Sequence, residues 1–225
     1  MPSQIVTAPV EEPISLADAR LFLRVDDDFT KEDTLISSTI SAARQDAETI
    51  TRRALVTQSW KMVADRFPNP GLVFGAATWF GPQWSNIPGP LTMALPEGKT
   101  GYEIFLPFPP LASVDSIKYI DVNGVQQTLD PSAYIVDTVS EPGRVTPAYS
   151  TSWPSIREQA NAVEVAFTCG YGSATAVPAG IRRWMKIRIA TLYNQREEVA
   201  ILSRGKVEAL PYVDGLLEPW RVIKF

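Results

Sequence analysis

The sequence predicts an α+β fold: a helical core, in which a long N-terminal helix packs on a C-terminal helix, with a small inserted antiparallel β domain. Residues 31–54 and 178–200 carry apolar side chains at the three- and four-residue spacing of amphipathic helices. The chain between them has many β-branched residues, glycines and prolines, and short alternating runs typical of strands and turns. Two strong helices on either side of a β-rich region favour a helical core with a sheet inserted into it.

Composition narrows the class of protein. Of the 225 residues, 45% are hydrophobic and 20% are charged, which suits one domain with an elaboration or two small domains sharing a core. The net charge of −4 argues against a protein whose main task is to grip nucleic acid through its phosphates. Histidine is absent and there is one cysteine, so the commonest general base and metal ligand are missing. We therefore expect no catalytic residues, no cofactor and no metal site.

The start of the chain, MPSQIVTAPVEEP, has neither the basic residues nor the apolar run of a signal peptide. No stretch approaches the roughly 20 apolar residues of a membrane span. We expect no signal peptide and no membrane contact.

Two N-terminal helices are predicted, each with a capping pattern at its start. Ser15 and Asp18 fit the arrangement in which side chains accept hydrogen bonds from free N–H groups, ahead of a short helix over Leu16–Arg24. Thr30 and Asp33 repeat the pattern.

The second of these helices is predicted over Lys31–Ala54, a length of roughly 36 Å at 1.5 Å per residue. Neither glycine nor proline interrupts it. We expect its buried stripe to comprise Ile36, Ile40, Ala43, Ala47 and Ile50.

The inserted β-rich region is expected over residues 58–172, beginning with a strand around Ser59–Phe67. Residues 68–101 then form a long loop with many glycines and prolines. This loop contains three large aromatic residues: Trp79, Phe80 and Trp84. Such residues either fold back on their own domain or contact a partner. The second alternative makes them a candidate contact between subunits or with another protein.

Shorter strands follow the loop. Asn123-Gly124 predicts a type I′ hairpin turn that pairs Val122 with Val125, because both central residues of that turn need positive φ. A further strand is expected in YIVD, residues 134–137. The run AVEVAFTC alternates apolar and polar residues, which indicates a half-buried strand.

Pro178 begins the C-terminal helix, predicted over residues 178–200. We expect its apolar stripe to face that of the long N-terminal helix, through Trp184, Met185, Ile189 and Leu192. Off the stripe lies a candidate charged contact face: Arg182, Arg183 and Lys186. Positive charge near a helix start opposes the helix dipole, which hints at an acidic protein surface or DNA as a partner. An ordinary solvated face is the alternative.

Residues 201–225 form the C-terminal tail. Glu218-Pro219 ends any preceding helix, because the residue before a proline avoids the α conformation. This leaves a short extended segment: Trp220, Arg221, Val222, Ile223, Lys224 and Phe225. Such a segment suits addition to a partner's sheet edge or insertion into a hydrophobic groove. Packing on the chain's own helices is the alternative.

Several stretches occur in an order and spacing that resemble a known family. They are PISLADARLFLRV, LISSTISAARQDAETITRRALVTQSW, PPLASVDSIKYIDVNGVQQTLDPSAYIVD, NAVEVAFTCGYG and VPAGIRRWMKIRIATLYNQRE. Over most of residues 13–197 the chain resembles the phage head–tail connector (adaptor) family of tailed phages, prophages and gene transfer agents. The loop over residues 68–101 is longer and more aromatic than the family pattern.

The resemblance implies a structural virion protein without catalysis, at the head–tail interface of particles assembled in the bacterial host cytoplasm. Such proteins form a ring beneath the twelvefold portal protein, extend the DNA channel and provide the attachment surface for a stopper or tail-completion protein. A ring of twelve copies is implied, with the tail as the portal-docking segment: Trp220, Arg221, Val222, Ile223 and Phe225. Because each copy carries −4, a negative channel would let DNA pass without specific binding.

The expected organisation is N-terminal core helices over 13–57, the β-rich region over 58–172, the C-terminal helix over 178–200 and the docking tail over 201–225. Two other functions remain open. One is a β-rich module that binds carbohydrate or a host surface through Trp79 and Trp84. The other is a carboxylate-dependent hydrolase, for which no carboxylate pair stands out.

Overall fold

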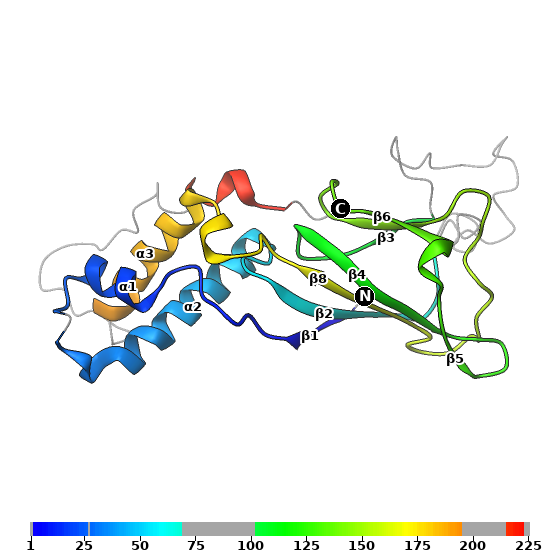
Figure 1. Cartoon of the computed structure of the whole chain (residues 1–225), viewed down its shortest axis with the longest axis horizontal. Coiled ribbons are helices and arrows are strands. Elements are labelled where there is room, and N and C mark those ends of the chain that lie inside the picture. Colours follow the sequence, from blue (N-terminus) through cyan, green and yellow to red (C-terminus); the bar gives the residue numbers. More distant parts are fainter. Residues whose placement is uncertain (1, 27, 69–101, 195–214, 223–225) are drawn as a thin grey trace, which may run out of the picture.

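A computed structural model describes residues 2–26, 28–68, 102–194 and 215–222 of the chain. Its helices are α1 (Leu16–Leu23), α2 (Asp33–Thr51) and α3 (Ala179–Asn194). Its strands are β1 (Ser3–Thr7), β2 (Gln58–Ala64), β3 (Ile104–Phe105), β4 (Leu111–Ile120), β5 (Gln126–Thr128), β6 (Tyr134–Asp137), β7 (Arg144–Pro147) and β8 (Val163–Cys169). The helices gather at one end of the molecule and the strands at the other (Figure 1). The predicted α+β class is confirmed.

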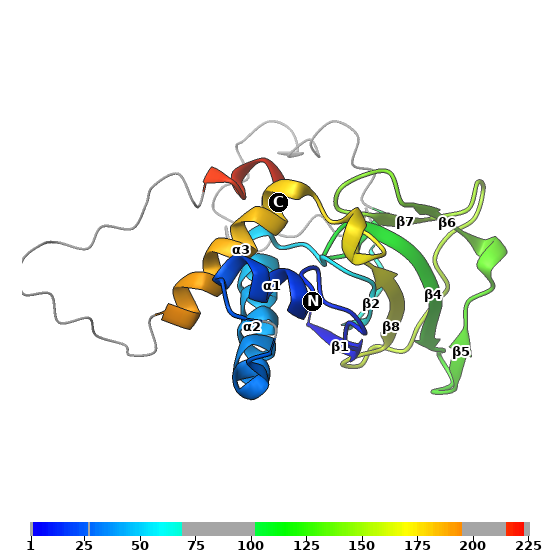
Figure 2. The same cartoon turned by 60° about the vertical axis from the view of Figure 1, so that its left-hand side comes forward.

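The helical end is built by α2 and α3, which cross obliquely (Figure 2). The predicted stripes meet in one core cluster, to which α2 contributes Ile36, Ile40, Ala43 and Ala47 and α3 contributes Trp184, Met185 and Ile189. Two predicted members differ: Ile50 is 37% exposed and Leu192 lies outside the cluster. None of the helices described is long and apolar enough to cross a membrane.

Of the two predicted helix caps, the structure contains the first but not the second. The Ser15 Oγ accepts a hydrogen bond from the Asp18 N–H at 3.1 Å, as expected. The cap predicted from Thr30 and Asp33 is wrong, because residues 30–32 form a 3₁₀ turn and α2 begins at Asp33 itself. The Asp33 carboxylate instead accepts a hydrogen bond from the Arg20 Nε at 2.8 Å. This ion pair ties the end of α1 to the start of α2.

An antiparallel five-stranded sheet has the order β1-β2-β8-β4-β5, with β8 at its centre. The predicted alternation along β8 is confirmed, since Val163, Val165 and Phe167 are buried. Strand β1 was not predicted. It pairs along β2, from Ser3 opposite Met62 to Thr7 opposite Ser59, and so extends the sheet with residues that precede both N-terminal helices.

A second sheet has the order β3-β7-β6. The predicted strand over residues 134–137 exists as β6, but it pairs with β7 instead of continuing the β4–β5 hairpin. Tyr134 and Val145 from this sheet join Ile117 and Phe167 from the larger sheet in a second core cluster. The inserted region therefore has its own core, enclosed between two sheets.

The β4–β5 hairpin turns differently from the prediction. The Asp121 N–H donates to the Val125 carbonyl at 2.9 Å, so Asp121 pairs with Val125 and the loop has three residues. Asp121 also accepts hydrogen bonds from the N–H groups of Asn123 and Val125, both at 2.9 Å. Only Gly124 has positive φ in this turn (85°), which fits a type I turn followed by a left-handed glycine. The carboxylate of Asp121 favours this turn over type I′.

The chain passes from α2 to β2 through residues 52–57, of which residues 53–56 are buried. Ala54 belongs to the core between the sheets, whereas Leu55 and Val56 belong to the helical core. This connection therefore separates the two cores and touches both.

Replacing Ile40 or Ile189 with alanine should lower the free energy of unfolding by roughly 2–5 kcal/mol, because both side chains are buried where α2 meets α3. Ile50→Ala is the matched control, since Ile50 is on the same helix but 37% exposed. Denaturant melts measure all three. A loss below about 1 kcal/mol at Ile40 and Ile189 would contradict their place in the core.

Candidate interaction sites

The predicted basic face lies on the first half of α3. Lys186 is half-buried and Arg183 is exposed, with its guanidinium carbon 5.8 Å from the centre of the Phe22 ring on α1. Arg182 is half-buried, and its Nε has no hydrogen-bond partner among the residues described. None of the three cations forms an ion pair within the described part of the chain.

The described part of the C-terminal tail lies against the chain's own helices. Glu218–Trp220 form a 3₁₀ helix, so the prediction that Trp220 is extended is wrong. The Val222 N–H donates to the Thr51 carbonyl at 3.0 Å, and Arg52 donates to the Val222 carbonyl at 3.3 Å. The main chain of this segment is thus bound at the C-terminal end of α2.

Two apolar contacts fix the same segment. Leu217 is 1% exposed in the helical core, and Trp220 packs on that core from outside. The Trp220 indole also lies beside Gly180, where an added Cβ would come within 3.4 Å of the indole nitrogen. Trp220 therefore packs on the start of α3, at Gly180. The first residue of the basic face, Arg182, follows two positions later on the same helix.

Arg53 joins three distant segments at this point. Its Nε donates to the Trp220 carbonyl at 2.6 Å, and its Nη1 donates to Glu141 Oε1 at 2.7 Å, in the turn between β6 and β7. The Arg53 side chain is only 8% exposed. The hydrogen bond from Arg53 lowers the pKa of the Glu141 carboxyl. One guanidinium thus links the end of α2, the smaller sheet and the C-terminal segment.

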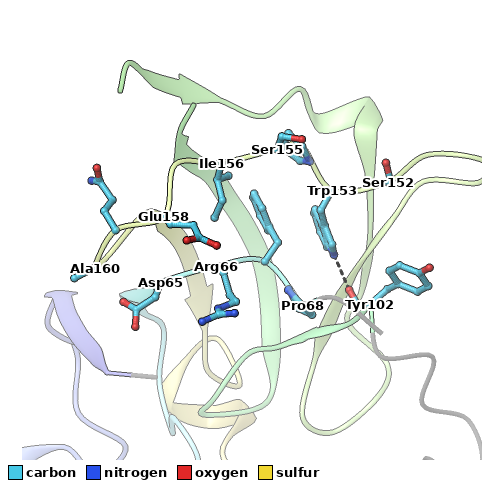
Figure 3. A pocket seen from close by; sticks show the side chains of 13 residues that line it. Asp65, Arg66, Pro68, Tyr102, Ser152, Trp153, Ser155, Ile156, Glu158 and Ala160 are labelled. Carbon is cyan, nitrogen blue, oxygen red and sulfur yellow. Dashed lines mark hydrogen bonds between the residues drawn. The ribbon is translucent and has the colours of Figure 1, made fainter. Parts of the chain in front are cut away.

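A cavity of about 730 Å³ lies between the chain that follows β2, at residues 65–68, and the chain that precedes β8, at residues 152–160 (Figure 3). Its wall includes Phe67, whose ring stacks on Trp153 with centroids 4.9 Å apart and planes 3° apart. The Trp153 indole N–H donates to the Tyr102 carbonyl at 2.8 Å, the hydrogen bond drawn in Figure 3. The stacked rings of Phe67 and Trp153 therefore give the cavity an aromatic wall.

The other predicted site residues are not placed. Trp79, Phe80, Trp84, Ile223 and Phe225 lie outside the described residues, so their roles stay predictions. Sequence reasoning missed Arg53, Glu141 and the cavity. No local pattern marks them, since their partners are about 90 or more positions away in sequence or come from separate loops.

Cys169 is buried in the core between the two sheets. Burial, with a smaller contribution from the nearby Glu48 charge, raises the pKa of Cys169 to about 12, so this thiol stays protonated near neutral pH. In the described ranges no cluster of three or more His, Cys, Asp or Glu side chains could hold a metal ion.

A family model described as "Phage gp6-like head-tail connector protein" matches residues 13–71, which span α1, α2 and β2. This match supports the family resemblance found in the sequence, for the N-terminal part of the chain. No curated protein gives a significant match to the chain.

Three solved structures are similar over 100% of this chain and 97% of their own. One comes from the neck of an empty GTA particle computed with C6 symmetry (22% identity, TM-score 0.71). Another comes from the virion of a native gene transfer agent (GTA) particle (21%, 0.68). The third comes from the neck of a native GTA particle computed with C12 symmetry (19%, 0.65). At these identities the likeness concerns the fold.

Replacing Glu141 with glutamine should weaken the junction around Arg53 at neutral pH, by about 1 kcal/mol because Glu141 is partly exposed. The pKa of the Glu141 carboxyl is lower in the folded chain than its ordinary value of 4.5. The ionised carboxylate therefore stabilises the fold above pH 4.5, and this stabilisation is lost as the pH falls through the lower, folded pKa. The difference in free energy of unfolding between wild type and variant should therefore shrink below about pH 4. Melts at pH 7 and pH 3 measure it.

Glu218→Gln is the control, since Glu218 is exposed and pairs only with the exposed Arg221 among the residues described. It should leave the melting temperature unchanged at both values of pH. If Glu141→Gln lowered the stability by the same amount at pH 3 as at pH 7, this would contradict an ionised Arg53–Glu141 pair.

Proposed function

We propose that the chain is a structural subunit of a head–tail connector, which forms a ring beneath the portal, extends the DNA channel and provides the attachment surface for a stopper or tail. The observation that carries this proposal is the similarity of fold along the whole chain to a neck protein of gene transfer agent particles, with a TM-score of 0.71. The match of a head–tail connector family model to residues 13–71 supports it independently.

Twelve copies are proposed for the ring. The related necks were treated with C6 and with C12 symmetry, and a ring of twelve is compatible with both because twelvefold symmetry contains sixfold symmetry. A heterologous ring needs two different surfaces on each copy. The elongated subunit, with helices at one end and sheets at the other, offers such unlike surfaces (Figure 1).

The partners follow from the sites. The proposed portal-docking segment is the C-terminal tail, in which Val222 is hydrogen-bonded to Thr51 at the end of α2 and Trp220 lies beside Gly180 at the start of α3. The basic face of Arg182, Arg183 and Lys186 on α3 suits an acidic surface on the portal or on a neighbouring copy. Residues 79–84 are proposed to contact a neighbouring copy or another virion protein.

The proposed role needs no chemistry, and we expect no enzymatic activity. The protein would reside in the virion at the head–tail interface, after assembly in the cytoplasm of the bacterial host. With −4 on each copy, the ring repels phosphate, which favours passage of DNA without specific binding.

Electron microscopy of the protein mixed with its portal tests the proposal. The expected image is a ring of subunits on the narrow end of the portal. The decisive variant ends after Val222, because it removes Ile223, Lys224 and Phe225 but keeps the contacts of Trp220 and Val222 with α2 and α3. It should melt like the full chain and fail to join the portal.

The comparison variant ends after Glu218 and loses those contacts as well, so it should also melt at a lower temperature. Unchanged portal binding by the chain that ends after Val222 would contradict the docking role of the tail. The absence of any ring with the full chain would contradict the proposed function itself.

A further inference from the structure

The cavity beside Trp153 lies at the end of the strands that is remote from the helices. Strands β2 and β8 run side by side, with Gln58 opposite Cys169 and Ala64 opposite Val163. Gln58 follows the connection from α2, and Cys169 precedes the chain that leads to α3, so this end of the pair adjoins the helices. The cavity is lined by residues that follow Ala64 and precede Val163. It therefore lies at the other end of these strands, roughly 20 Å away at 3.3 Å per residue.

The lining of this cavity is suited to a basic side chain. Trp153 is half-buried, so part of its indole surface is accessible from the cavity. The exposed carboxylates of Asp65 and Glu158 stand on the same wall, where Arg66 adds a single positive charge (Figure 3). The lining therefore carries net negative charge beside an aromatic surface. A guanidinium group gains both from stacking on an indole and from hydrogen bonds with a carboxylate.

The basic face on α3 supplies a guest of this kind. Arg183 is its exposed member, between the half-buried Arg182 and Lys186. The guanidinium carbon of Arg183 lies 5.8 Å from the centre of the Phe22 ring, close to the limit of roughly 6 Å for a cation–π contact, so this contact holds the side chain only weakly. Because α3 belongs to the helical end and the cavity to the other end, an arginine side chain is too short to reach the cavity of its own copy (Figure 1).

We infer that Arg183 of one copy enters this cavity on the adjacent copy of the ring, where it stacks on Trp153 and pairs with the carboxylates of Asp65 and Glu158. The inference rests on the proposed ring and identifies the neighbouring copy as the partner of the basic face. Two basic faces would repel each other, and so would two negative cavities, which disfavours an isologous pair. The contact is therefore heterologous, from the helical end of one copy to the sheet end of the next, and it repeats around a closed ring.

An exchange of charges tests the inference. Arg183→Glu and Glu158→Arg each bring like charges together at the contact. Each should therefore raise the protein concentration at which half of the portals carry a ring, by at least about tenfold. The variant with both substitutions has opposite charges again and should return this concentration close to the wild-type value. Lys31→Glu is the control, because Lys31 is exposed in the 3₁₀ turn before α2 and the charge change is the same; it should assemble like wild type.

Each other outcome counts against the inference. If the double variant assembled no better than the single variants, Arg183 and Glu158 would act at separate contacts. A loss from Arg183→Glu alone would place the basic face on the portal, and normal assembly by both single variants would mean that neither residue is in a contact. If the wild-type chain forms no ring, the proposed function fails first, which separates the two results.

Cross-linking covers the case in which the charge variants disturb folding. Arg183→Cys and Glu158→Cys in one chain place thiols on the two sides of the contact, while Cys169 is buried. A short bis-maleimide added to portal-bound rings should link chains into a ladder that continues beyond dimers on denaturing gels, because each copy is joined on two sides. The control, with Lys31→Cys in place of Arg183→Cys, should give no ladder. Intact rings without links, a ladder that stops at dimers, or one of equal strength from the control would overturn the inference.

Discussion

The connection between α2 and β2 is the constraint around which the molecule is arranged. Residues 54–56 lie between two cores and are almost fully buried, so their backbone groups must find partners inside the protein. The Leu55 N–H donates to Glu48 at 3.0 Å, and the Ala54 N–H donates to the Pro109 carbonyl at 3.2 Å. Burial raises the pKa of the Glu48 carboxyl, although its hydrogen bonds with the Leu55 N–H, Arg44 and Gln58 act in the opposite direction. Gly170 passes so close that a Cβ there would lie 2.3 Å from the Val56 oxygen.

This junction also positions the surfaces proposed to bind other molecules. Helix α2 ends with Arg52 in the left-handed conformation, and the chain then turns Arg53 toward Glu141 and Trp220. The C-terminal segment is therefore held where the helical end meets the sheets, beside the start of α3.

Much of the fold could be predicted because it depends on local patterns. Helical periodicity identified α2 and α3, and alternation identified β8. What failed depends on distant partners. The sequence pattern indicated that Asp33 caps a helix, whereas its carboxylate pairs with Arg20, thirteen positions earlier. Residues 3–7 form the strand β1 by pairing with the edge of β2, which lies more than 50 positions away. For the sites, composition marked the basic face and the tail, whereas Arg53 acquires its role only when three segments meet.

If copies of this chain form a closed ring on a portal, the mass of the complex will show it. Native mass spectrometry of the portal, before and after addition of the protein, counts the bound chains. A closed ring should add twelve chains in one step, with few intermediate species, because each copy contacts its neighbours as well as the portal. A gain that rises gradually with concentration, or stops at a number that does not match the portal symmetry, would contradict it.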